Sequence, residues 1–214
     1  MNSIKISDKI ISSNNPPLII AEMSGNHNSS LDRAMKIVEE AARCGAHMLK
    51  LQTYTPDTMT INVHNKDFNI KDKNSLWDGE NLYNLYSKAY TPWEWHKPIF
   101  ERAKELGLLC FSTPFDSTAV DFLEKLNVPA YKVASFENND LKLIKKIAST
   151  GKPIIISTGM ASVSEIEEMV FTMRQEKNNG FILLKCTSTY PANPSNSNLL
   201  TIPHMKKLFS CQVG

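Results

Sequence analysis

The sequence predicts an α/β protein, a (β/α)8 TIM barrel whose chain stops after about six strand–helix units. Short apolar runs, typical of strands buried on both faces, alternate with segments whose apolar residues follow helical spacing. From the third run onward the runs begin at residues 108, 130, 153 and 181, a spacing that favours a barrel over a doubly wound sheet. A closed barrel needs eight units in about 250 residues. We therefore expect one partial barrel domain over residues 1–214.

Each strand is predicted from an apolar run, and each helix from its spacing and end signals. The expected strands cover residues 18–23, 47–53, 108–113, 130–135, 153–157 and 181–187, with the start of a seventh at 211–214. The expected helices cover residues 31–42, 93–106, 118–126 and 141–148, a segment after Ser162, and 199–209.

Residues at the helix ends support these boundaries. Ser29 and Asp32 have the spacing of a capping box before the first helix. Gly45 and Gly107 stand where C-terminal caps are expected. Pro98 lacks an N–H group, so the regular part of the second helix is expected to start near it.

One long segment, residues 54–90, interrupts the alternation of strands and helices. It places Trp77, Tyr83, Tyr86 and Tyr90 among polar residues. A connection of this length is usually functional, so we expect a lid or a substrate-binding loop.

Composition and charge exclude several classes of protein. Lys plus Arg number 24 and Asp plus Glu 22, a balance that argues against a surface for nucleic acid. No apolar run approaches the roughly 20 residues of a membrane helix, and residues 1–15 do not resemble a signal peptide. Four cysteines without a CxxC pair indicate reduced thiols in a cytoplasmic protein. We expect small-molecule partners rather than a membrane or nucleic acid.

Two lysines within apolar strands predict a pocket for an anion. Lys50 and Lys132 lie toward the carboxyl ends of their strands, where the function of a barrel gathers. Burying an unpaired ammonium group is costly, and an anionic ligand between the two would compensate both charges. Hydroxyl groups at other strand ends can donate to the same ligand, namely Thr113, Ser135, Ser157 and Ser188. The alternatives are lysines that reach solvent and a Ser157 segment that only caps the next helix.

The first strand also delivers polar residues to this end. Glu22 closes the strand, and Asn26 and His27 follow it directly. We interpret Glu22 as functional, with a structural salt bridge as the alternative. The other histidines have no metal-like spacing.

Ordered motifs resemble those of the sialic acid synthase family from residue 18 to residue 214. They read IIAE at 19–22, NH at 26–27, KLQTYTPD at 50–57, LWD at 76–78, WEWH at 93–96, CFSTPF at 110–115, AYKVASFE at 130–137, STGM at 157–160 and LKCTSTYP at 184–191. The segment at 50–57 is similar to the family's pseudaminic branch.

The resemblance implies the condensation of phosphoenolpyruvate with an N-acetylated amino sugar, which in the pseudaminic branch is 2,4-diacetamido-2,4,6-trideoxy-altrose. C3 of phosphoenolpyruvate attacks the open-chain aldehyde, water adds to C2, and phosphate leaves to give a nonulosonic acid. A divalent cation, manganese or magnesium, polarises the aldehyde in the family.

The resemblance also implies a role for each matching residue. Phosphoenolpyruvate would be held by Lys50, Thr113, Lys132, Ser135, Ser157 and Ser188. Glu22 would transfer a proton or position water, and Glu137 is a second catalytic candidate. The sugar would face Asn26, His27, Gln52 and Tyr190. At Ser188, sialic acid members typically carry Asn.

The sequence ends at Gly214, before the family's Gly-Leu-Ser-Asp-His motif. Both metal-binding histidines of the family are expected beyond Gly214, as is its C-terminal antifreeze-like domain. We therefore expect no metal ligand within these 214 residues. We expect this polypeptide alone to be unstable or inactive, and the full-length protein to be a homodimer.

Three other functions remain open. The sugar could be that of a sialic or legionaminic acid synthase. Lys50 or Lys132 could instead act as the nucleophile of a Schiff-base aldolase. The chain could also be an inactive remnant of a synthase.

Overall fold

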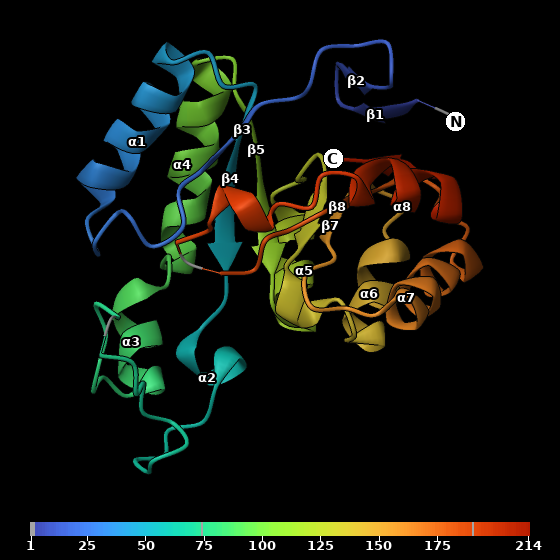
Figure 1. Ribbon diagram of the computed structural model, residues 1–214. Helices are drawn as coiled ribbons and strands as arrows, with labels where there is room; N and C mark the ends of the chain where they lie inside the picture. The colour runs from blue at the N-terminus through green and yellow to red at the C-terminus, as the bar shows by residue number, and fades with distance from the viewer. Residues whose placement is uncertain (1–2, 74, 190) are drawn as a thin grey trace. The chain divides into compact units, whose positions relative to one another are not determined.

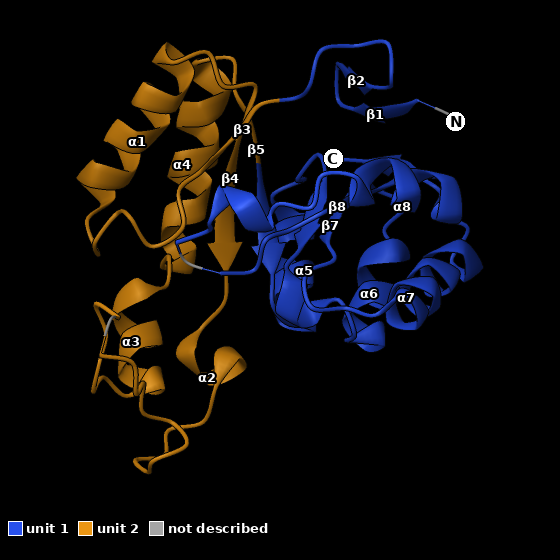
Figure 2. Cartoon of the chain, in the orientation of Figure 1, with its two compact units in different colours: residues 1–18, 111–214 blue, residues 19–110 orange. Residues whose placement is uncertain are grey.

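The computed structural model describes residues 3–73, 75–189 and 191–214 of the chain. These residues form two compact units (Figures 1 and 2). Unit 2 comprises residues 19–110, and unit 1 comprises residues 1–18 and 111–214. The parallel strands follow the chain order β3-β4-β5-β6-β7-β8-β9, and strand β5 continues from unit 2 into unit 1. In the described part of the chain, no helix is long and apolar enough to cross a membrane.

Unit 2 holds the first predicted strands and helices. Its strands are β3 (Ile20–Glu22), β4 (Met48–Thr53) and the start of β5 (Leu109–Pro114), and its helices are α1 (Leu31–Arg43), α2 (Pro56–Met59), α3 (Leu82–Ala89) and α4 (Trp93–Glu105). Apolar residues of α1, β4 and α4, among them Val38, Leu51 and Ile99, share one core. Burying each such side chain stabilises the unit by about 1.5–3 kcal/mol.

The N-cap of helix α1 lies one residue after the predicted one. Ser30 is the N-cap, and its Oγ accepts a hydrogen bond from the Arg33 N–H at 3.2 Å. The prediction of Ser29 as the cap is wrong, because its backbone takes a positive φ of 53° and its Oγ donates to the Lys88 carbonyl. Gly45 follows the helix with φ +81°, as predicted for a C-terminal cap.

Helix α4 starts at Trp93, as predicted for the helix over residues 93–106. It runs from Trp93 with Pro98 inside it, so the expectation that regular helix starts near Pro98 is wrong. The helix begins after Pro92, whose carbonyl accepts a bond from the Trp95 N–H. Burial of His96 and Ile99 against the core offsets the one backbone bond that Pro98 cannot make.

Unit 1 contains the remaining parallel strands. They are the rest of β5, then β6 (Tyr131–Val133), β7 (Ile154–Ser157), β8 (Phe181–Leu184) and β9 (Gln212–Val213). All four residues of β7 are buried, as expected for a strand covered on both faces.

Strand β9 confirms the predicted start of a seventh parallel strand. Ile182 of β8 is paired with Gln212. The same pairing continues through Gly214, whose N–H donates to the Leu183 carbonyl at 2.9 Å and whose carbonyl accepts from the Lys185 N–H at 2.8 Å. The residues up to Gly214 therefore extend the sheet beside β8.

Helices of unit 1 connect these strands in the predicted order (Figure 1). They are α5 (Ser117–Lys125), the one-turn 3-10 helix η1 (Ser135–Glu137), α6 (Leu141–Ala148), α7 (Val163–Gln175), η2 (Pro194–Asn196) and α8 (Thr201–Phe209). Ser162 and Glu165 form a complete capping box at α7.

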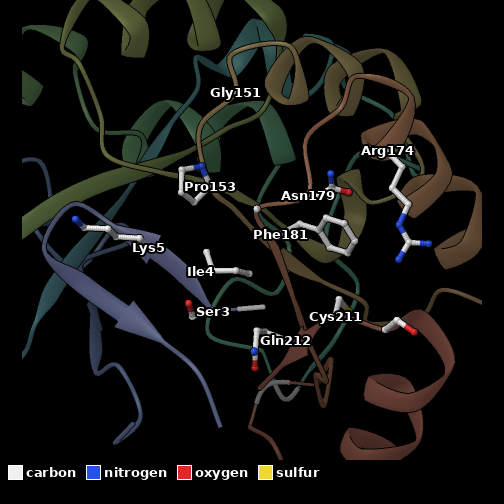
Figure 3. Close-up of a pocket in the computed structure, with 12 residues that line it drawn as sticks. Ser3, Ile4, Lys5, Gly151, Pro153, Arg174, Asn179, Phe181, Cys211 and Gln212 are labelled. Carbon is white, nitrogen blue, oxygen red and sulfur yellow. The ribbon is translucent and has the colours of Figure 1, made fainter. Parts of the chain in front are cut away.

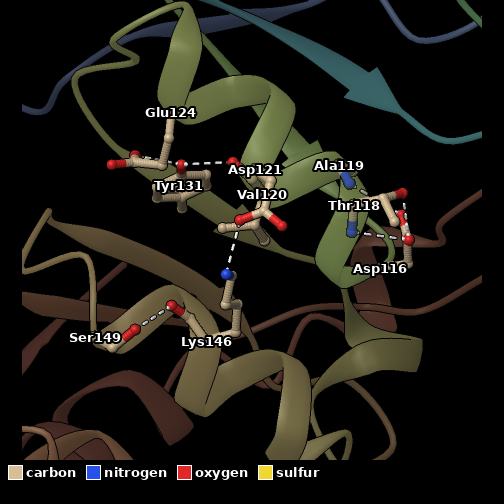
Figure 4. A network of polar contacts seen from close by, with 9 residues as sticks. All are labelled: Asp116, Thr118, Ala119, Val120, Asp121, Glu124, Tyr131, Lys146 and Ser149. Carbon is tan, nitrogen blue, oxygen red and sulfur yellow. Dashed lines mark hydrogen bonds and ion pairs between the residues drawn. The ribbon is translucent and has the colours of Figure 1, made fainter.

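A polar network links α5, β6 and α6 (Figure 4). The Tyr131 hydroxyl donates to Glu124 at 2.6 Å, and Lys146 pairs with Asp121 at 2.7 Å. Glu124 also pairs with Lys152 at 2.7 Å. The network gives a partner to the Tyr131 hydroxyl, whose side chain is buried in the core.

An N-terminal hairpin belongs to unit 1 and has no counterpart in the sequence analysis. Strands β1 (Ile4–Ile6) and β2 (Lys9–Ile11) pair antiparallel. Ile4 and Ile6 are buried while Lys5 between them is exposed, the alternation of a strand with one covered face.

The segment at 54–90 is partly ordered rather than a featureless loop. It contains α2, α3 and an isolated bridge between Asn69 and Asn81. The Asn81 amide donates to the Val63 and Phe68 carbonyls, which ties the segment to the start of α3. A lid role for it stays a prediction.

Candidate functional site

In unit 2, parallel pairing of β3 with β4 brings Glu22 opposite Lys50. The Lys50 ammonium group donates to a Glu22 carboxylate oxygen at 2.5 Å. Lys50 is only 8% exposed, whereas the side chain of Glu22 is 48% exposed. A buried cation is thus held next to a carboxylate that solvent and small molecules can reach. The salt-bridge interpretation of Glu22 predicted such a partner, and a functional role for Glu22 stays a prediction.

The loop after β3 is tightly wound. Ser24 and Asn28 have positive φ values of 49° and 46°, conformations that L-residues adopt rarely. Such local strain is often found at functional sites. Asn26 is exposed, and its side-chain amide donates to the Met23 carbonyl at 2.9 Å.

His27 lies at the centre of that loop and is completely buried. Its Nε2 lies 3.1 Å from the Thr91 hydroxyl, its Nδ1 accepts from the Ser29 N–H, and its ring meets Trp95 edge-on. Burial lowers the pKa of His27, which favours the neutral ring that these partners require. This arrangement positions the loop, and direct contact between His27 and a sugar stays a prediction.

Gln52 and Tyr190 are the two other predicted sugar-binding residues. Gln52 lies two residues after Lys50 on β4, so both project from the same face of the strand. Tyr190 lies outside the residues that the structure describes.

In unit 1, the other predicted lysine is also buried. Lys132 is 8% exposed, and its ammonium group donates to the Ser157 hydroxyl at 2.5 Å and to the Val133 carbonyl at 2.7 Å. Parallel pairing of β6 with β7 brings these residues together. Thr113, on the neighbouring strand β5, is buried as well.

Two further predicted hydroxyl groups converge on Gly159. A Cβ atom placed on this glycine would lie 1.9 Å from the Ser188 Oγ and 2.7 Å from the Ser135 Oγ. The loops that follow β6, β7 and β8 therefore meet at Gly159, where any larger residue would displace the Ser135 and Ser188 side chains. Ser135, Ser157 and Ser188 lie in these three loops or at their start, which gives the predicted anion pocket of unit 1 a defined centre.

Glu137 ends the turn η1 that begins at Ser135. Its buried Oε2 has no hydrogen-bond partner among the residues that the structure describes. Burial raises the pKa of Glu137, and the positive charge of Lys132 opposes that shift. A carboxyl group that retains its proton more readily than usual is suited to proton transfer.

Asn138 is a buried polar residue that the sequence analysis did not single out. Its side-chain amide donates to the Ser157 carbonyl at 3.4 Å and to the Gly159 carbonyl at 3.2 Å. The sequence offered only a weak signal, an Asn directly after the predicted Glu137.

The described residues do not form a metal site. No group of three or more His, Cys, Asp or Glu in that part of the chain could hold a metal ion. The donor set present in unit 1 consists of hydroxyl and ammonium groups, which suits an anion and not a cation. The placement of the family's metal-binding histidines beyond Gly214 stays a prediction, because it concerns residues outside this sequence.

A cavity of about 430 Å³ lies at the opposite ends of the strands in unit 1 (Figure 3). It is lined by the N-terminal hairpin and by residues at the amino ends of β7, β8 and β9, including Ile4, Pro153, Phe181 and Gln212. In a barrel, that end serves stability and the carboxyl ends serve function. We therefore place the candidate site around Lys132 and Gly159 rather than in this cavity.

Comparison with known proteins assigns the family. The protein-family model for the NeuB family matches residues 37–214. The chain belongs to the NeuB family. It is 46% identical over 196 residues to a pseudaminic acid synthase of Campylobacter jejuni, covering 92% of this chain and 57% of that protein. It is also 46% identical over 199 residues to the pseudaminic acid synthase of Helicobacter pylori, covering 93% of this chain and 58% of that protein.

A solved structure extends the comparison to the fold. The crystal structure of N-acetylneuraminic acid synthetase from Leptospira borgpetersenii, in complex with citrate, matches 100% of this NeuB family chain and 69% of its own, with 31% identity and a TM-score of 0.87. This match and the order of parallel strands confirm the predicted barrel class. The chain spans a little over half the length of the two pseudaminic acid synthases, at 57% and 58%.

Proposed function

We propose that this NeuB family chain is the substrate-binding portion of a pseudaminic acid synthase, a transferase. The reaction condenses phosphoenolpyruvate with 2,4-diacetamido-2,4,6-trideoxy-altrose to give pseudaminic acid and inorganic phosphate. The observation that carries the proposal is the 46% identity to two pseudaminic acid synthases, together with motif residues that lie at the carboxyl ends of the strands.

Lys132 and the hydroxyl groups of unit 1 are assigned to phosphoenolpyruvate. The Lys132 ammonium group, already hydrogen-bonded to Ser157, supplies a buried positive charge. The Ser135 and Ser188 hydroxyls beside Gly159 supply neutral donors to anionic oxygens, and Thr113 is assigned the same role. Charge-assisted hydrogen bonds of this kind contribute about 1.5–3 kcal/mol each.

Lys50 and Glu22 of unit 2 supply a second cation and an accessible carboxylate. We assign Lys50 to the anionic substrate as well, and Glu22 to proton transfer or to orienting the water that attacks C2. Asn26, His27, Gln52 and Tyr190 are assigned to the sugar.

Glu137 is assigned to proton transfer. The new bond forms between C3 of phosphoenolpyruvate and the aldehyde carbon, and the aldehyde oxygen takes up a proton. Water then adds to C2 and loses one proton to a base, a role that we assign to Glu22. The C2–O bond to phosphate breaks as the new C2 hydroxyl gives its proton to the departing phosphate, which leaves a keto group at C2. A buried carboxyl group with a raised pKa can supply the proton in the first step.

We assign no residue of this chain to the divalent cation that the family uses. The described residues offer it no ligand set. Reduced cysteines and the use of phosphoenolpyruvate favour a cytoplasmic reaction, and we propose a homodimer on the basis of the family resemblance.

The test is phosphate release by the gene product that contains these residues. The purified protein receives phosphoenolpyruvate, manganese or magnesium, and in turn the altrose derivative, N-acetylmannosamine and the legionaminic precursor. We expect the highest kcat/KM with the altrose derivative. Preference for N-acetylmannosamine would contradict the proposed sugar and favour a sialic acid synthase.

The Schiff-base alternative needs a separate test. Borohydride reduction in the presence of pyruvate traps an imine on a nucleophilic lysine. We expect no mass increase on the peptides that contain Lys50 and Lys132. A covalent adduct on either peptide would replace the synthase proposal with an aldolase.

A further inference from the structure

Asn138 links two loops that the proposed function places around phosphoenolpyruvate. It is the residue directly after the turn η1, which carries Ser135 and Glu137. Its side chain reaches across to the loop after β7, which carries Ser157 and Gly159. Only 6% of Asn138 is exposed, so these bonds are made away from solvent.

We infer that Asn138 is a positioning residue for phosphoenolpyruvate binding, an inference that rests on the proposed function. Its two amide hydrogens hold the Ser157 and Gly159 carbonyl oxygens at 3.4 Å and 3.2 Å. Carbonyl oxygens repel anions, and the amide keeps both oxygens turned toward itself. The Ser157 hydroxyl, and the Ser135 and Ser188 hydroxyls beside Gly159, then remain available to the anion.

The bonds of Asn138 also set the distance between hydroxyl groups. The Gly159 backbone lies against Ser135 and Ser188, so a shift of this backbone changes the spacing of both hydroxyls. On the other side of the loop, the Thr158 hydroxyl and N–H both donate to the Leu184 carbonyl. The loop after β7 is thus bonded on both sides. Thr158 bonds to the end of β8, and Asn138 bonds to the loop from the turn after β6, next to Glu137.

Unit 1 contains a matched control at the other end of β7. Asn178 is 5% exposed, and its amide donates to the Ala148 and Lys152 carbonyls at 3.2 Å and 2.9 Å. Its oxygen also accepts from the Gly180 N–H. The two asparagines are thus both buried and each donates to two carbonyl oxygens, but of the two only Asn138 donates to Ser157 and Gly159.

The experiment compares Asn138→Ala with Asn178→Ala in the gene product that contains these residues. Calorimetry measures the Kd for phosphoenolpyruvate, kinetics separates the KM of each substrate from kcat, and thermal unfolding reports stability. We expect both variants to lower the melting temperature. Asn138→Ala raises the Kd and KM for phosphoenolpyruvate about 10-fold, as the loss of buried hydrogen bonds implies, and leaves the sugar KM within about twofold. Asn178→Ala leaves the Kd within about twofold.

A second variant keeps the test valid if Asn138→Ala does not fold. Asn138→Ser retains one hydroxyl donor, and we expect a Kd about threefold above that of the wild type. Equal weakening by Asn138 and Asn178 variants, or an unchanged Kd in folded Asn138 variants, would overturn the inference while leaving the proposed function in place. Failure of the wild-type protein to bind phosphoenolpyruvate would overturn the proposed function and this inference together.

Discussion

Lys132 and Ser157 show how an apolar sheet accommodates a buried cation. A buried ammonium group is costly unless it is bonded, and here it donates to one hydroxyl and one carbonyl oxygen. An anionic ligand would add a charge-assisted hydrogen bond to those that Lys132 already makes. The sequence predicted both residues because lysine and serine are unusual in apolar strands.

Replacing Lys132 tests this assignment. Lys132→Met keeps the length of the side chain and removes the charge, so we expect the Kd for phosphoenolpyruvate to rise about 10- to 100-fold. The melting temperature should stay the same or rise, because a buried charge is removed. Calorimetry and thermal unfolding measure the two effects. Lys152→Met is the control, since Lys152 pairs with Glu124 at 2.7 Å and should not affect the Kd.

Glu137 gives a prediction for pH dependence. Burial raises its folded pKa above the unfolded value, so the folded state binds more protons between the two values. Stability therefore decreases as pH rises through that window, and the contribution is fully favourable below it. Glu137→Gln should lose this dependence and gain melting temperature relative to the wild type at pH 7, but not at pH 4. Thermal unfolding at both pH values checks the sign.

Activity provides the second measurement for Glu137. Removal of a proton donor should lower kcat about 10²-fold, with a smaller change in the KM for phosphoenolpyruvate. Glu165→Gln is the control, because Glu165 is an exposed residue of the α7 capping box. A Glu137→Gln variant with wild-type kcat would remove Glu137 from the proposed chemistry.

Among the elements, the N-terminal hairpin shows how a short segment gains stability from distant residues. Three-residue strands are marginal in isolation. Strand β1 nevertheless directs Ile4 and Ile6 into unit 1, and Ile4 lines the same cavity as Phe181 and Gln212 (Figure 3). Lys5, between the two isoleucines, is exposed and also borders this cavity.

Substitutions at neighbouring positions of β1 test the hairpin. Ile6→Ala removes a fully buried side chain and should cost about 2–5 kcal/mol of unfolding free energy. Lys5→Ala, one residue away on the exposed face, should change it by less than about 0.5 kcal/mol. Urea unfolding measures both. Equal effects would mean that the hairpin does not contribute to the core of unit 1.

For the whole molecule, close packing of the backbone divides the chain into two compact units (Figure 2). The stretch between α2 and α3 is rich in exposed side chains. Leu76, at 95% exposure, and Trp77, at 53%, lie in this stretch. Such segments are the first to be cleaved by proteases.

Limited proteolysis tests this organisation. We expect trypsin to cut first after Lys66, Lys71 and Lys73, which are exposed and lie between helices. Lys97 is also exposed but lies inside α4, so it should be cut later. Mass spectrometry over a time course identifies the order of cleavage. Early cleavage at Lys97 would show that α4 unfolds locally.

The order and type of the main elements followed from the sequence because their signals are local. Apolar periodicity depends on neighbouring residues, and it predicted α6 at residues 141–148 and the parallel strands through β9. The burial of Lys50 and Lys132 was predicted for a similar reason, since lysine stands out within apolar strands, and the anion pocket itself stays a prediction.

Tertiary structure decided what depends on residues far apart in the chain. The cap of α1 is Ser30 because Ser29 bonds to the distant Lys88 carbonyl. The hairpin, the convergence of Ser135 and Ser188 on Gly159, and the bridge made by Asn138 all join segments separated in sequence. Local patterns contain no information about such contacts, which form only when the chain has folded. The sequence alone therefore determined the elements and the chemistry of the candidate residues, and the folded structure determined which of them meet.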